Sequence, residues 1–189
     1  MILNAVNEFF TNQNFYIMKR LLLLIGIVAI LSTFTVAQQT KAEKKAENEA
    51  EGNAKFKKAV EAIDAKDFVI VVDMFRKGSN WFPTTDFTNF FSYEKQSAYI
   101  QGAIFFGLTY PSSHKLDVSD YKQLVDKKGN VRVEMFVRGS MTKGKIEIFV
   151  RKGGNNADVI YTMRGFVVRY SGEVVPTAES NYFKRPNEV

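Results

Sequence analysis

Two glutamates could face each other as a pair of carboxylates. Glu134 and Glu147 fall in two segments that alternate apolar and polar residues, which predicts neighbouring strands of a hairpin with the glutamates facing each other. Glycoside hydrolysis uses such a carboxyl pair. The surrounding residues are cations that would pair with these glutamates as surface ions: Arg132, Arg138, Lys145 and Arg151. We therefore expect surface ion pairs here, and a hydrolase is the least favoured function.

His114, the single histidine, offers a weaker possibility. Ser112 or Ser113 and Asp117 could complete a Ser–His–Asp set on paper, but residues this close in sequence rarely reach the geometry of a relay. No nucleophile-elbow pattern surrounds either serine. We expect an exposed loop histidine and no catalytic triad.

The chain has no cysteine, and with one histidine this leaves few ligands for zinc or copper. Asp117, Asp120 and Asp126 do not have the spacing of a calcium-binding loop. Asp126 followed by Gly129 instead predicts a turn. The composition thus predicts no metal, cofactor or disulfide, and no enzymatic activity.

Positive charge is concentrated in the second half of the chain. Residues 122–189 carry 13 Lys and Arg against 7 Asp and Glu, whereas residues 38–121 carry 11 against 12. On the polar face of the predicted hairpin, two phenylalanines stand among arginines, giving a candidate ligand surface of Arg132, Phe136, Arg138, Phe149 and Arg151. The commoner explanation is that a helix or another sheet covers the phenylalanines. The alternative is a surface for an acidic glycan, a lipid headgroup or an envelope protein.

A second aromatic group is a candidate apolar pocket at one end of a barrel or sandwich. Ordinary core and loop packing is the more usual explanation for such residues. The group consists of Trp81, Phe82, Phe105, Phe106 and Tyr110.

Residues 18–37 have the order of a secretory signal. Lys19 and Arg20 precede eleven apolar residues, and the segment ends in the small residue Ala37. A spanning helix needs roughly 20 apolar residues, so we expect cleavage between Ala37 and Gln38 and a soluble product in the periplasm or outside the cell. An uncleaved anchor is the alternative. Residues 1–17 fit a start codon assigned too early.

The predicted mature chain begins with a charged spacer at residues 38–52, followed by a single β-rich domain at residues 53–189. The spacer has no apolar stripe. Asn53 is the expected N-cap of a helix that ends near Lys66. Phe56, Ala59, Val60 and Ile63 would form its buried face.

After this helix the apolar pattern changes to that of strands. Residues 77–85 are expected to form a loop, and no helical pattern separates the strands. We predict a mainly β (α+β) fold: one N-terminal helix, then an antiparallel meander of about eight strands forming a sandwich or partly open barrel. The expected strands are 68–75, 89–93, 97–101, 121–125, 131–138, 146–150, 158–164 and 166–175.

Several of these stretches resemble an uncharacterised family of exported bacterial proteins, the domain of unknown function numbered 4251. The resemblance covers roughly residues 40–185, including a Lys/Glu/Ala-rich segment directly after a signal peptide. The resemblance rests on four short motifs: Asn89–Phe90, Asp126–Asn130, Gly153–Ala157 and Tyr170–Pro176. The Gly-rich middle segment of that family has lost most of its glycine here, at residues 102–111. The family has no established activity, so the resemblance implies fold and location and transfers no catalytic residue.

Together these observations favour an exported, non-enzymatic binding module for a glycan, lipid or envelope partner. A structural or assembly factor of the envelope is the alternative. Nucleic acid is not expected as a partner, because the signal directs the chain out of the cytoplasm, and membrane contact is expected only through the signal before cleavage.

Overall fold

The computed structural model describes residues 40–102, 105 and 113–186. The predicted signal, its cleavage site at Ala37 and Gln38, and residues 1–17 lie outside these ranges. The chain divides into two units, Met1–Asn48 and Glu49–Val189. In the first unit, residues 40–48 are helical and fully exposed, which suits a charged segment without an apolar stripe.

In the second unit the helix continues to residue 64. The expected N-cap at Asn53 is wrong, because the residues on both sides of it are helical; Ala, Glu and Lys favour helix, so the charged segment does not interrupt it. The predicted buried face is confirmed. Ala59 and Ile63 are fully buried in the main core, and Phe56 and Val60 pack against it.

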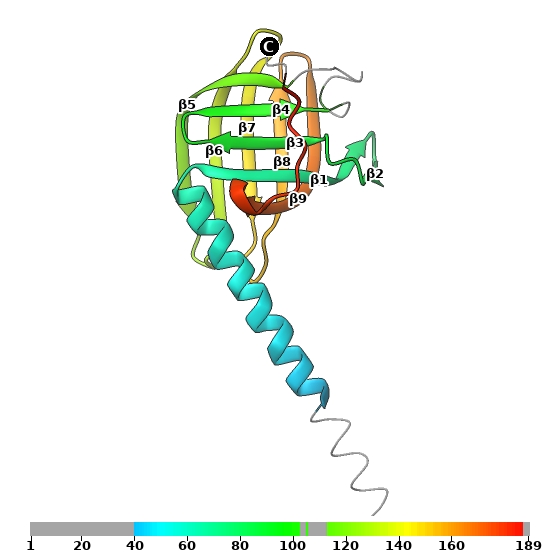
Figure 1. Ribbon diagram of the computed structural model, residues 1–189, viewed down its shortest axis with the longest axis vertical. Helices are drawn as coiled ribbons and strands as arrows, with labels where there is room; N and C mark the ends of the chain where they lie inside the picture. Colours follow the sequence, from blue (N-terminus) through cyan, green and yellow to red (C-terminus); the bar gives the residue numbers. More distant parts are fainter. Residues whose placement is uncertain (1–39, 103–104, 106–112, 187–189) are drawn as a thin grey trace, which may run out of the picture. The chain divides into compact units, whose positions relative to one another are not determined.

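The strands form a closed eight-stranded antiparallel barrel with a ninth strand paired outside it (Figure 1). Neighbours in sequence are neighbours in the barrel, and β9 pairs with β1 to complete the circle. The strands are β1 (Asp67–Lys77), β2 (Asn80–Pro83), β3 (Phe90–Glu94), β4 (Ser97–Gln101), β5 (His114–Val125), β6 (Val131–Arg138), β7 (Lys143–Val150), β8 (Asn156–Met163) and β9 (Phe166–Pro176), followed by the short helix η1 (Thr177–Glu179). The predicted helix and antiparallel meander are confirmed, and the arrangement is a barrel that closes.

Alternation along the strands fills the barrel interior. Val131, Val133, Met135 and Val137 of β6 point inward and are buried, whereas the residues between them face outward. An eight-stranded barrel has an interior just wide enough to be filled by side chains or to hold one small ligand. Here, buried residues from all eight strands and the helix form one continuous core.

Two sequence predictions, one for residues 77–85 and one for His114, are wrong. Residues 77–85 are not simply a loop, because β2 pairs with the end of β1. All four residues of β2 are exposed, so the segment lacks the alternation that would have revealed it. His114 is not an exposed loop residue: it begins β5, is 2% exposed, and burial lowers its pKa.

The predicted turn at Asp126–Asn130 is confirmed. The Asp126 side chain accepts hydrogen bonds from the backbone N–H groups of Lys128 and Asn130 at 2.8 and 2.9 Å. Gly129 has a φ of 82°, which suits glycine best. This turn joins β5 to β6 at one end of the barrel.

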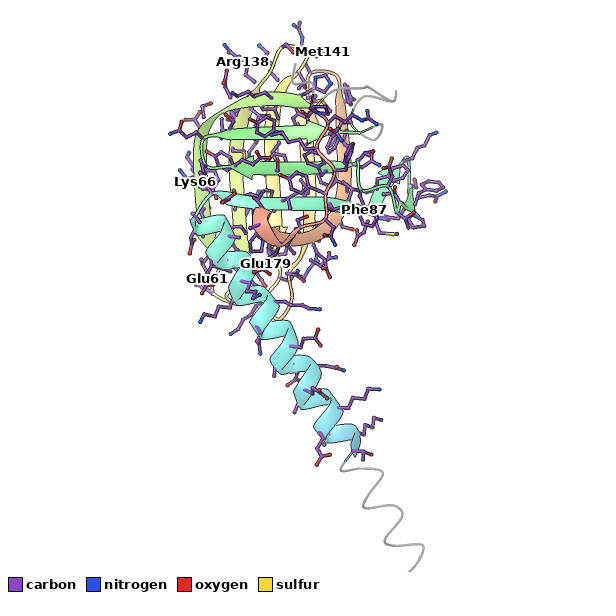
Figure 2. The ribbon with its side chains drawn as sticks, viewed as in Figure 1. Glu61, Lys66, Phe87, Arg138, Met141 and Glu179 are labelled. Atoms are coloured by element: carbon purple, nitrogen blue, oxygen red, sulfur yellow. The ribbon has the colours of Figure 1, made fainter. Side chains whose placement is uncertain are left out.

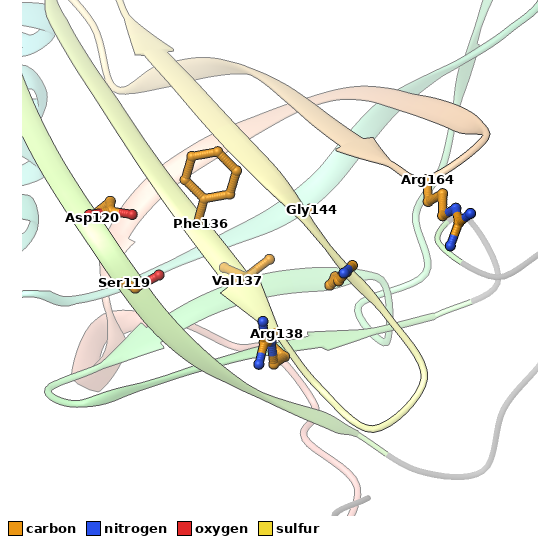
Figure 3. A pocket seen from close by; sticks show the side chains of 8 residues that line it. Ser119, Asp120, Phe136, Val137, Arg138, Gly144 and Arg164 are labelled. Carbon is orange, nitrogen blue, oxygen red and sulfur yellow. The ribbon is translucent and has the colours of Figure 1, made fainter.

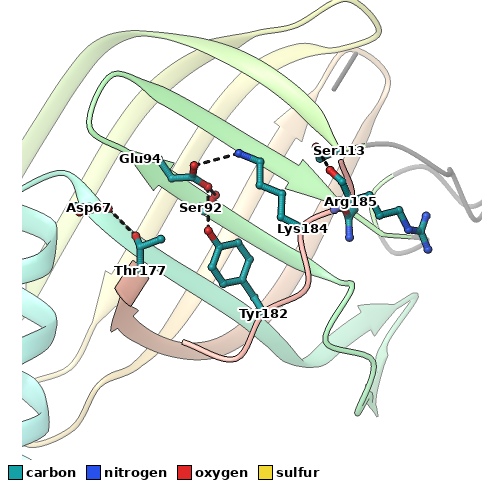
Figure 4. A network of polar contacts seen from close by, with 9 residues as sticks. Asp67, Ser92, Glu94, Ser113, Thr177, Tyr182, Lys184 and Arg185 are labelled. Carbon is teal, nitrogen blue, oxygen red and sulfur yellow. Dashed lines mark hydrogen bonds and ion pairs between the residues drawn. The ribbon is translucent and has the colours of Figure 1, made fainter. Parts of the chain in front are cut away.

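The C-terminal segment covers the outer face of β3 and β4 (Figure 4). Tyr182 packs edge-on against Phe90, with ring centroids 4.8 Å apart. Lys184 forms an ion pair of 3.0 Å with Glu94. The amide of Gln101 donates to the Phe183 carbonyl and accepts from the Arg185 N–H. These bonds fix the segment, so this part of the outer wall is not open to a ligand.

Gly172 lies in β9 where this strand pairs with β1 to close the barrel, and little space is left beside it. A Cβ at this position would overlap the carbonyl oxygen of Val71 in β1. We predict that Gly172→Ala lowers the free energy of unfolding by about 2–3 kcal/mol, because the added atom forces the two backbones apart. Urea unfolding measures the change. Gly154→Ala is the control: it meets no described atom within 4 Å and should change stability by less than about 0.5 kcal/mol. Equal effects of the two substitutions would contradict a tight closure.

Candidate functional site

Three cations gather at the barrel end opposite the Asp126 turn. Arg138 ends β6, Lys143 begins β7, and Arg164 lies in the turn between β8 and β9. Together they are called the cationic rim. In an up-and-down barrel alternate connections lie at the same end, which brings these two hairpins together. All three side chains line two adjoining surface depressions, the first with a volume of about 470 Å³ (Figure 3).

The cationic rim has little compensating charge. Within the described ranges, none of its three side chains lies within 4.0 Å of a carboxylate oxygen, whereas other cations of the sheet do form ion pairs. Asp117 is opposite Arg138 in the β5–β6 register, and Asp120 lines the first depression, but neither reaches an ion-pair distance. The rim therefore presents a net positive charge to solvent.

Exposed apolar side chains accompany the rim. Phe136 lines the first depression and is 50% exposed; Met141 and Phe166 line the second and are also about half exposed. Figure 2 shows Met141 beside Arg138 at this end of the barrel. The expectation that a helix or second sheet covers Phe136 is wrong, because the strands form one sheet and the Phe136 side chain is half exposed.

A network of four charges occupies the middle of the β6–β7 surface. Glu134 and Glu147 are directly opposite in register, as the sequence predicted. Arg132 and Lys145 each contact both carboxylates, at 2.6 to 3.2 Å. The hydrogen bond from Arg132, followed by that from Lys145, lowers the pKa of Glu147. A general acid requires a raised pKa, so the lowered pKa of Glu147 is that of a paired surface ion.

The network divides the predicted ligand surface into two parts. Arg138 belongs to the cationic rim, and Phe136 lines the first depression beside it. Phe149 and Arg132 line a third depression, where the guanidinium of Arg151 stacks over the Phe149 ring at 5.3 Å and pairs with Asp158 at 2.6 Å. Arg132 and Arg151 are thus already engaged by carboxylates, and only the rim part keeps uncompensated charge.

The described residues of the predicted aromatic pocket do not come together as a unit. Phe105 is 1% exposed and lies in the barrel core, with its ring edge-on to Tyr170 at 5.3 Å. Trp81 and Phe82 are exposed on β2. Phe106 and Tyr110 lie outside the described residues.

Sequence reasoning missed Lys143 and Arg164 as site residues. Both stand at turns, where cations are common and carry no pattern of their own. The strand order could have identified them, because the β6–β7 and β8–β9 turns of a meander lie at the same end of the barrel.

The described residues contain neither a metal-ligand cluster nor a membrane-spanning helix. No three His, Asp or Glu side chains in these ranges lie close enough together to hold a metal ion. No helix in the same ranges is both long and apolar enough to cross a membrane.

The four-charge network predicts a pH effect on stability. The pKa of Glu147 is below its ordinary value of 4.5 in the folded protein, so its contribution is present above about pH 4.5 and is lost as the pH falls through the folded-state pKa. Glu147→Gln should lower the free energy of unfolding at pH 7 by about 1 kcal/mol or less. The variant should also lose less stability than the wild type between pH 7 and pH 3, measured by urea unfolding. Identical pH dependence in both proteins would contradict the network.

Comparison with known proteins identifies the family. The comparison with curated proteins found no match. A solved structure described as a DUF4251 family protein from Bacteroides eggerthii DSM 20697 is similar, with 25% sequence identity and a TM-score of 0.61. The match covers 70% of this chain and 95% of that one. The family model for the domain of unknown function DUF4251 matches residues 50–174. The chain therefore belongs to the DUF4251 family.

Proposed function

We propose that this protein is an exported, non-enzymatic binding module of the cell envelope that binds an acidic glycan at the cationic rim. The observation that carries the proposal is the convergence of Arg138, Lys143 and Arg164 on one depression, with no carboxylate of the described residues within ion-pair distance. Elsewhere on the sheet, arginines beside carboxylates are neutralised. Uncompensated cations that share a concave surface favour an anionic ligand.

The chemistry of the rim suits a uronate or sulfated sugar. Two guanidinium groups can each bind a carboxylate or sulfate through two parallel hydrogen bonds, and Lys143 adds a point charge. Phe136 beside them offers an apolar face for a sugar ring. The depressions are open, so contact with several sugar units is expected and binding should weaken with salt.

A role as a binding module also accounts for the filled barrel and the paired glutamates. The core side chains occupy the interior, and both Glu134 and Glu147 are engaged by cations. Neither feature supports a hydrolytic centre.

Charge removal tests the proposal. The triple variant Arg138→Ala, Lys143→Ala, Arg164→Ala should bind galacturonic-acid oligosaccharides roughly 10- to 100-fold more weakly than the wild type. Each hydrogen bond to a charged group contributes about 1.5–3 kcal/mol, from which the cost of ordering the side chain and the sugar is subtracted. Isothermal titration calorimetry measures the affinity. The control, Lys127→Ala, Lys128→Ala, Lys152→Ala, removes the same charge from exposed turns at the other end and should bind like the wild type. Equal loss in both triples, or equal binding of neutral maltooligosaccharides, would reject the rim as the site.

The export step of the proposal makes a separate prediction. Mass spectrometry of the protein isolated from its host should give a mature N-terminus at Gln38, because cleavage follows Ala37. The same spectrum reads any retained glycan. An intact chain in the membrane fraction, beginning at or before Met18, would contradict cleavage and support the anchor.

A further inference from the structure

The end of β1 and the whole of β2 form a two-stranded ribbon outside the barrel. Beyond Phe75, β1 pairs with β2 alone, and residues 74–83 are called the aromatic ribbon. Figure 1 shows β2 lying clear of the barrel wall. A two-stranded ribbon is only marginally stable by itself, and among the described residues the main core contacts this one at its base, through Phe75.

Each face of the aromatic ribbon carries apolar groups and a cation. One face has the Phe75–Phe82 pair, with ring centroids 5.9 Å apart, and Lys77 beside it. Phe75 also packs against the barrel core, so Phe82 supplies the exposed ring of this face. The other face has Trp81 directly opposite Arg76. Trp81 is 44% exposed and Phe82 is 41% exposed, so each of the two opposite faces presents one partly exposed aromatic ring to solvent.

The acidic group nearest in sequence is held at the base of the ribbon. Asp73 accepts a hydrogen bond of 2.8 Å from the hydroxyl of Ser171 in β9. Ser79 and Asn80 at the tip are uncharged, so Arg76 and Lys77 give the ribbon its positive charge. This charge is complementary to a phosphate-rich surface.

The two-faced arrangement discriminates between partners. A folded protein docked on one face would leave the aromatic group of the other face in water. The headgroup region of a bilayer surrounds an inserted ribbon on both faces at once. Tryptophan also prefers this region, where its ring is buried and its N–H stays hydrogen-bonded.

We propose that the aromatic ribbon inserts into the headgroup region of an anionic phospholipid bilayer. Trp81 and Phe82 enter the boundary between headgroups and acyl chains, and Arg76 and Lys77 contact lipid phosphates. The inference is independent of glycan binding at the cationic rim. It would hold the protein at a membrane surface while the rim faces its own ligand.

Trp81 is the single tryptophan of the chain, so its fluorescence reports on the ribbon directly. With the full chain, mixed phosphatidylglycerol–phosphatidylcholine vesicles should shift Trp81 emission to shorter wavelength, and brominated acyl chains should quench it. Arg76→Gln with Lys77→Gln should weaken this response roughly 30-fold in lipid concentration. These exposed positions leave the core intact. The control Lys127→Gln with Lys128→Gln should respond like the wild type.

Several outcomes would overturn the inference. Unchanged Trp81 emission in protein that sediments with the vesicles would mean that another segment, such as the apolar residues 21–31, makes the contact. An equal shift on pure phosphatidylcholine would reject recognition of anionic lipid, and a shift caused by a soluble protein without lipid would assign the ribbon to a protein partner. The rim variant Arg138→Ala, Lys143→Ala, Arg164→Ala should keep the full shift, so failure of one proposal is distinguishable from failure of the other.

Discussion

The pairing of β1 with β9 is the constraint on which the rest of the structure depends. It joins the first and last strands of the chain, and without it the meander would be an open sheet with two long edges. The register shifts between Val72 and Met74, and this bulge lets β1 continue past the barrel. Asp73 at the bulge is held by Ser171 of β9. One strand thus closes the barrel and also starts the aromatic ribbon.

Closure determines where binding can occur. The described inward side chains, such as those of Phe105 and Tyr170, pack together into one core inside the barrel. The outer wall is divided further: the C-terminal segment covers β3 and β4, and the four-charge network neutralises the centre of β6 and β7. Uncompensated charge beside exposed aromatic groups then stays at the barrel end and on the ribbon.

Most of the fold could be predicted from the sequence because inward residues alternate cleanly, as in Val131 to Val137 of β6. The pattern fails where a strand lacks a buried face, and β2 was missed for that reason. It also fails at His114, because a lone histidine after a proline-containing segment gives no sign of the ladder that buries it. Only part of the site could be predicted. Alternation placed Phe136 and Arg138 on the outer face of the sheet. The ion pair between Arg151 and Asp158, and the position of Arg164 in the same depression as Arg138, depend on how the strands pair.

The cationic rim and the aromatic ribbon combine similar residue types in opposite shapes, and this difference in shape is why a different ligand is proposed for each. The rim is concave, and its cations come from three separate positions, so a multiply charged ligand that fits the depression gains from all of them. The ribbon is convex and aromatic on both faces, so only an environment that surrounds it can remove both faces from water. Arginine beside phenylalanine or tryptophan therefore does not define one function. A hollow lined by such residues favours a discrete anionic molecule, whereas a two-faced projection favours a lipid surface.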